Sequence, residues 1–73
     1  MNTQTRAILA YLRANPGGIT PLEALGAIGC FRLGARIFDL KALGYEIATD
    51  RVTTRSGKRV ARYRLVEQLE AGL

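Results

Sequence analysis

Histidine is absent from this chain, cysteine occurs once, as Cys30, and serine occurs once, as Ser56. A single cysteine excludes an internal disulfide, and without histidine it has no partner for a zinc site. Neither Cys30 nor Ser56 has a histidine that could activate it as a nucleophile, and no carboxylates form an evident catalytic pair. The sequence therefore predicts no enzyme, no cofactor and no metal site, and it fits a reducing compartment, the cytoplasm.

Long hydrophobic runs are also missing. The longest run near the start covers residues 7–12, whereas a helix that spans a bilayer needs about 20 apolar residues. No small-residue cleavage pattern follows this run. We therefore expect neither export nor a membrane anchor.

The overall composition is that of a folded domain. The chain has 73 residues, of which 48% are hydrophobic and 23% are charged, and no repeat or linker divides it. A chain of this size buries only roughly 60% of the surface that its unfolded form exposes. We expect one domain over residues 1–73 with a small core.

Acidic residues are missing from one segment, residues 51–64, which holds six basic ones, while the rest of the chain has five basic and six acidic residues. The formal net charge of +5 is therefore concentrated in this segment. Ser56-Gly57 lies between two runs of β-branched and long side chains, a pattern typical of a β-hairpin, which we expect over residues 45–65. Such a cationic hairpin is suited to binding phosphates. The alternative is a solvated hairpin whose charges only protect its edges against aggregation.

Two helices are predicted in the first part of the chain. The first covers residues 3–14, with Asn2 or Thr3 as its N-cap, and its apolar face consists of Ile8, Leu9 and Leu12. The second covers residues 20–28 and begins with Thr20, Pro21 and Glu23 in the arrangement of a capping box. Its predicted buried stripe is Leu22, Leu25 and Ile28, and Gly29 is expected to end it in a left-handed conformation.

A third helix is predicted over residues 31–43, where Leu33, Ile37 and Leu40 recur at helical spacing. Gly44 is expected to end it. Because few residues separate the second helix from the third, the two should form a helix-turn-helix.

The strands of the hairpin are less regular in sequence. Tyr45 and Ile47 fall on one face and Val52 on the other, which predicts a bulge or a frayed outer half. In the return strand Tyr63 and Leu65 are expected to point inward and the arginines at 62 and 64 outward. The tail, residues 66–73, carries a short helical pattern or frays.

Four stretches, residues 19–25, 32–40, 44–47 and 53–59, resemble the small helix-turn-helix proteins of bacteriophages and prophages, within the winged helix-turn-helix superfamily. The resemblance covers roughly residues 4–65. It implies an α+β fold of three helices followed by a β-hairpin wing, and binding to double-stranded DNA. Gly34 departs from the alanine or serine of the family pattern. Glycine there costs on the order of 1 kcal/mol relative to alanine, but it permits close approach to another backbone.

The candidate contacts with DNA lie on the third helix and on the hairpin. An α-helix fits the major groove, so Arg32 and Arg36 are predicted to contact bases and Ala35 a thymine methyl group. The alternative for Arg36 is an ordinary surface ion pair with Asp39, and the alternative for Arg32 is a solvated side chain without a contact. Backbone contacts are predicted for the wing residues Arg55, Lys58, Arg59 and Arg62.

Thr20 and the aromatic residues are the remaining candidates for a contact with a ligand. Thr20 could bind a phosphate at the start of the second helix, although its capping role is the simpler one. The aromatic residues are expected in the core, apart from Phe38, which lies off the main stripe and could face a partner.

The leading hypothesis is a phage transcriptional regulator or accessory DNA-binding factor in the cytoplasm of a bacterial host cell. The alternative is an interaction module that binds a host or phage protein through the winged helix. A homodimer formed through the first helix or the tail would suit a pseudo-palindromic site.

Overall fold

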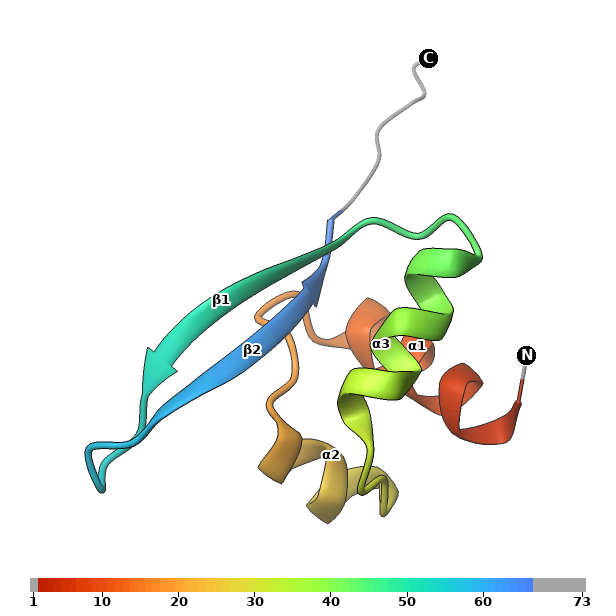
Figure 1. Cartoon of the computed structure of the whole chain (residues 1–73). Helices are drawn as coiled ribbons and strands as arrows, with labels where there is room; N and C mark the ends of the chain where they lie inside the picture. Colours follow the sequence, from red (N-terminus) through yellow and green to blue (C-terminus); the bar gives the residue numbers. More distant parts are fainter. Residues whose placement is uncertain (1, 67–73) are drawn as a thin grey trace.

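The computed structural model describes residues 2–66, in which three helices are followed by a β-hairpin that projects from the helical body (Figure 1). The elements are α1 (Thr3–Ala14), α2 (Pro21–Ile28), α3 (Leu33–Ala42), β1 (Ile47–Thr53) and β2 (Arg59–Leu65). This order confirms the α+β architecture of a winged helix-turn-helix. The prediction for the tail falls outside the described residues except for Val66, whose N–H donates to the Glu46 carbonyl over 2.9 Å.

Local signals in the sequence determine where α1 and α2 begin. Asn2 is the N-cap of α1, and its Oδ1 accepts a hydrogen bond of 2.7 Å from the Thr5 N–H. At α2 the capping box is complete, because Thr20 Oγ1 accepts from the Glu23 N–H (3.2 Å) and Glu23 Oε1 accepts from the Thr20 N–H (2.9 Å). Gly29 ends α2 with a φ of 77°, as predicted.

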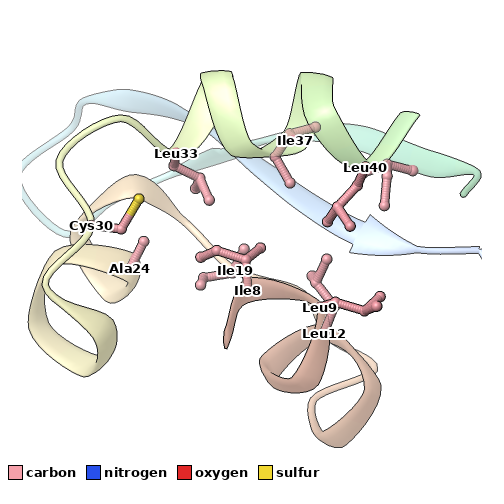
Figure 2. Close-up of a cluster of buried hydrophobic side chains, with 10 residues drawn as sticks. Ile8, Leu9, Leu12, Ile19, Ala24, Cys30, Leu33, Ile37 and Leu40 are labelled. Atoms are coloured by element: carbon pink, nitrogen blue, oxygen red, sulfur yellow. The ribbon is translucent and has the colours of Figure 1, made fainter. Parts of the chain in front are cut away.

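The core lies between α1 and α3, and Figure 2 shows the side chains of the two helices pointing toward each other. The predicted faces of both helices are confirmed by the buried residues Ile8, Leu9, Leu12, Leu33, Ile37 and Leu40. Ile19, from the segment before α2, fills the centre of this cluster and is fully buried. These contacts fix the orientation of α3, and therefore which of its side chains face away from the body.

The buried stripe predicted for α2 is wrong. Leu22 is 77% exposed and Leu25 is also exposed, whereas Ala24 is fully buried and Ile28 is half-buried. In Figure 2 Ala24 and Cys30 point into the core from the helix and from the turn after it. A small side chain at the contact lets α2 approach the core closely, and its two leucines remain at the surface.

This packing predicts opposite effects for two substitutions in α2. Leu22→Gln should change the free energy of unfolding by no more than about 0.5 kcal/mol, since its side chain is already exposed. Ala24→Leu should destabilise the fold by about 1 to 3 kcal/mol because it overpacks the core. Urea denaturation followed by circular dichroism measures both, and a larger loss for Leu22→Gln than for Ala24→Leu would contradict the observed orientation.

The third helix is shorter than predicted. It begins at Leu33 instead of residue 31, and Arg32 is its N-cap residue without a side-chain capping bond. At the other end, the Tyr45 N–H donates to the Leu40 carbonyl and the Gly44 N–H to the Lys41 carbonyl. This is a Schellman motif, and it requires the left-handed φ of 103° that Gly44 adopts.

The hairpin is regular, so the predicted bulge or frayed half is wrong. Its strands pair one to one from Ile47↔Leu65 at the base to Thr53↔Arg59 near the tip. Val52 pairs with Val60 on the face opposite Ile47. The outer half of the hairpin extends beyond the helices (Figure 1). Neither face of this half packs against the core, so apolar residues such as Val52 can lie on either face without a bulge.

The base of the hairpin is tied to the segment before α2. Ile19 and Tyr63 exchange two backbone hydrogen bonds, of 2.7 and 2.9 Å, in an isolated antiparallel bridge. Tyr63 and Leu65 pack against the core as predicted. The bridge therefore connects the direction of the wing to the helix-turn-helix.

Candidate nucleic-acid interface

The basic residues of the hairpin divide into paired and unpaired groups. Arg64 Nε lies 2.9 Å from Asp50 Oδ2 on the neighbouring strand, and Arg62 Nη2 lies 3.9 Å from Glu23 Oε2 on α2. Both pairs lie toward the body of the protein. Their charges are largely compensated at these positions.

The unpaired group lies toward the tip and consists of Arg51, Arg55, Lys58 and Arg59, which we call the wing-tip cluster. All four residues are exposed, and none forms an ion pair within residues 2–66. Arg51 and Arg59 lie on one face of the hairpin, since Arg59 pairs with Thr53, two residues after Arg51. Four neighbouring cations without counter-charges create a positive potential that attracts an external anion.

The turn at the tip is ordered by its own polar groups. The Thr54 N–H donates to the Lys58 carbonyl over 2.8 Å, and Thr54 Oγ1 accepts from the Lys58 N–H over 3.2 Å. Gly57 supplies the left-handed residue, with a φ of 87°. The turn holds Arg55 and Lys58 at the end of the wing without using their side chains.

Arg62 is the predicted wing residue that the structure places differently from the others. Its side chain is half-buried, and its Nε is buried without a hydrogen-bond partner among the described residues. The ion pair with Glu23 directs its guanidinium toward α2. Arg62 therefore connects the wing to α2 and is less available to a ligand than the wing-tip cluster.

On α3, the two arginines predicted to read bases differ in availability. Arg32 is exposed at the N-cap and forms no ion pair within residues 2–66. The Arg36 side chain is only 22% exposed, and its Nε lies 3.1 Å from Asp39 Oδ2. The buried Thr5 hydroxyl of α1 also donates to Asp39 Oδ2, over 3.3 Å. The alternative ion pair of Arg36 is thus the observed one, and it ties Arg36 to the body.

The outer side of α3 is more apolar than the sequence indicated. Phe38 is 70% exposed, as its position off the stripe predicted, while Ala35 is half-buried. Phe31, expected in the core, is 83% exposed in the turn before α3. The three tyrosines do pack against the core. The exposure of Phe38 could be predicted because the helical period places it off the buried stripe. Phe31 lies outside the helix, so the period gives no information about its exposure.

Thr20 has little capacity left for a phosphate. Its residue is almost buried, its N–H donates to Glu23, and its hydroxyl oxygen accepts from the Glu23 N–H. The backbone N–H of Thr20 is therefore used by the capping box, and only the O–H donor of an almost buried side chain is left for a phosphate. Phosphate binding by Thr20 stays a prediction without support from this geometry.

Residues 2–66 contain no group of three or more histidine, cysteine, aspartate or glutamate side chains that could hold a metal ion. Within the same residues, every helix is too short or too polar to cross a membrane.

Comparison with known proteins agrees with this architecture. No curated protein and no solved structure matches the chain significantly. A family model described as a winged helix-turn-helix domain matches residues 3–68, which includes all three helices, the hairpin and the wing-tip cluster. Domains of this family are typically DNA-binding and non-enzymatic. The chain belongs to the winged helix-turn-helix family.

Proposed function

We propose that this protein binds double-stranded DNA, with α3 in the major groove and the hairpin against the sugar-phosphate backbone. The observation that carries the proposal is the wing-tip cluster, whose four cations are exposed and unpaired while the other arginines of the hairpin are paired. Protection of the strand edges against aggregation would require charge on both strands. It would not require that the unpaired cations gather at the tip while the paired arginines lie toward the body. A polyanion is the ligand that compensates such a cluster.

The arrangement of the elements supports the same function. The hairpin extends beyond the helices, as Figure 1 shows, so the tip can reach a phosphate strand beside the groove that α3 occupies. Arg55, Lys58 and Arg59 then position the protein on the backbone, whereas α3 supplies sequence preference. Arg32, exposed at the start of α3, is the arginine best placed for a base or phosphate contact.

The test is the salt dependence of binding to a labelled duplex of random sequence, measured by fluorescence anisotropy. With each phosphate contact contributing about 0.9 to the slope, the wing-tip cluster alone predicts a log-log slope of roughly −3.6. Additional contacts from Arg32 or Lys41 would make it steeper. No binding even at low salt would contradict the proposal.

We further assign the protein to phage or prophage DNA, as a transcriptional regulator or an accessory factor in the bacterial cytoplasm. The support is the resemblance of the helix-turn-helix and wing sequences to small phage proteins. A reporter gene with a selected binding site at its promoter tests the regulatory role. Expression that is unchanged when the protein is produced would favour the accessory role.

A homodimer on a pseudo-palindromic site stays a prediction. One flank of α1 carries the exposed cations Arg6 and Arg13, with the Arg13 guanidinium 5.8 Å from the centroid of the Tyr45 ring. A two-fold contact through that flank would bring like charges together, which disfavours the interface predicted on α1. The tail, the other candidate, lies outside the described residues except for Val66. The stoichiometry of the DNA complex decides between a monomer and a dimer.

A second candidate function is an interaction module for a host or phage protein. The exposed apolar side chains of Leu22, Phe31 and Leu43 favour it, since interface anchors are commonly large and apolar. Under this alternative, Phe31→Ser would abolish capture of a stoichiometric partner from nuclease-treated lysate, and the protein would bind no duplex.

A further inference from the structure

The part of α3 that faces away from the core has an unusual composition. Leu33, Ile37 and Leu40 define the inner side, and in Figure 2 they point toward α1. By the helix period, the opposite side consists of Ala35, Phe38 and Ala42. Phe38 dominates this outer face, because its ring is 70% exposed between two small residues.

The polar side chains of α3 are arranged around the outer face and not on it. Arg36 and Asp39 form an ion pair through Arg36 Nε, and the same Asp39 oxygen accepts from the Thr5 hydroxyl of α1, so both side chains are held toward the body at the side of the outer face. Arg32 precedes the helix and Lys41 lies in its last turn. Between these two exposed cations, the face offers a ligand only apolar contact.

Gly34 is consistent with an external ligand at this face. A Cβ atom built on it would have no neighbour within 4 Å and its φ is not positive, so packing within the chain does not require glycine there. In a helix, glycine is less favourable than alanine by roughly 1 kcal/mol. The absence of a side chain leaves room beside Phe38 for another molecule to approach the backbone.

Duplex DNA presents one apolar group in the major groove, the C5 methyl of thymine, and alanine and phenylalanine side chains are suited to contact it. Cations flank Phe38, and the wing-tip cluster adds further positive charge. A protein partner would need an apolar pocket surrounded by acidic residues to match this surface. The thymine methyl within a phosphate-lined groove matches it without further assumption.

We propose that Phe38, with Ala35 beside it, is a specificity-determining residue that recognises thymine methyl groups in the major groove. This inference rests on the proposed function, DNA binding. It assigns sequence readout to apolar contact, in place of the arginine hydrogen bonds that the sequence predicted. Arg32 then adds a phosphate or base contact at the edge of the same surface.

The test compares thymine with deoxyuridine, which lacks only the methyl group. Binding sites are first selected from a random duplex library, and the thymines of the best site are then replaced one at a time. Burial of one methyl group corresponds to about a fourfold change in affinity, so one or two replacements should each weaken wild-type binding by about that factor. Replacements outside the contacted positions should have no effect.

Variants assign the effect to Phe38. Phe38→Ala should lose most of the preference for thymine over deoxyuridine at the position that the ring contacts, because an alanine methyl group reaches less far from the helix, and it should fold normally because the Phe38 side chain is exposed. Phe31→Ala is the matched control, since it removes an aromatic ring that is also exposed but lies outside the helix. It should retain the preference for thymine.

The outcomes separate this inference from the function on which it rests. If the wild type binds the selected site equally well after every replacement of thymine by deoxyuridine, the methyl readout is wrong and DNA binding remains supported. The same applies if Phe38→Ala retains the preference. If the wild type binds no duplex at low salt, both proposals fail.

Discussion

Changing Arg55, Lys58 and Arg59 together to alanine is expected to remove most of the affinity for random-sequence DNA. All three side chains are exposed and unpaired within the described chain, so each can release a counterion on contacting a phosphate. At 0.1 M salt each such contact contributes about eightfold to affinity, and three contribute on the order of 500-fold. The log-log salt slope should become shallower by about 2.7, as measured by fluorescence anisotropy.

A second triple variant, which removes the same number of charges elsewhere, distinguishes the effect of the position of the charges from the effect of their number. Arg6, Arg13 and Arg64 carry the same total charge, but two lie on α1 and the third is paired with Asp50. Changing these three to alanine should weaken binding by less than about tenfold, because only long-range attraction is lost. Equal losses for the two triple variants would show that net charge alone drives binding, with no contact made by the wing.

The triple variant at the tip should leave folding intact. Within residues 2–66 the three side chains make no hydrogen bond or ion pair, and the turn is held by Thr54, Ser56 and Gly57 instead. Removing mutually repelling charges should, if anything, slightly stabilise the hairpin. A loss of affinity can therefore be attributed to the contact with DNA, once circular dichroism shows the native spectrum.

The features that were predicted correctly are those that nearby residues in the sequence determine. The capping box of α2 needs only Thr20 and Glu23 at the correct spacing, and Gly29 ends the same helix by its own backbone freedom. The inner face of α3 follows from three apolar residues at a clear period. The hairpin follows from a turn signal between two runs of strand-forming residues.

The orientation of α2 could not be predicted in the same way. This helix has eight residues, and apolar side chains occur on most of its circumference, from Leu22 through Ala24 and Leu25 to Ile28. Its period therefore does not select a face. The core cluster, which includes Ile19 and Cys30 from outside the helix, buries the smallest of these residues, Ala24.

Only part of the division of the basic residues could be predicted from the sequence. The spacing of Arg36 and Asp39 indicated their ion pair. The hydrogen bond from Thr5 of α1 to Asp39 and the pairing of Arg62 with Glu23 join elements that are far apart along the chain. Composition shows six cations between residues 51 and 64. Tertiary structure is needed to show which of them remain available to a ligand.

The substitution Gly18→Ala is expected to be the most destabilising single change in the loop that holds the wing. A Cβ atom on Gly18 would clash with the Tyr63 carbonyl oxygen and would lie 3.1 Å from Arg62 Cγ, and the φ of 99° is strained for any side chain. The backbone of Tyr63 cannot yield without breaking its two hydrogen bonds to Ile19. We expect a loss of about 3 kcal/mol or more in the free energy of unfolding, a large part of a margin that is roughly 5 kcal/mol in a small domain.

Gly17→Ala is the matched control for this change, because a Cβ there meets no atom within 4 Å and the φ is not positive. It should be neutral, or stabilising by up to about 1 kcal/mol through the lower entropy of the unfolded chain. Urea denaturation measures both variants. Similar stability of the two would mean that the bridge between Ile19 and Tyr63 does not fix the wing to the helices. If Gly18→Ala instead stays folded but loses DNA affinity, the bridge serves to aim the wing-tip cluster at the phosphate backbone while α3 occupies the groove.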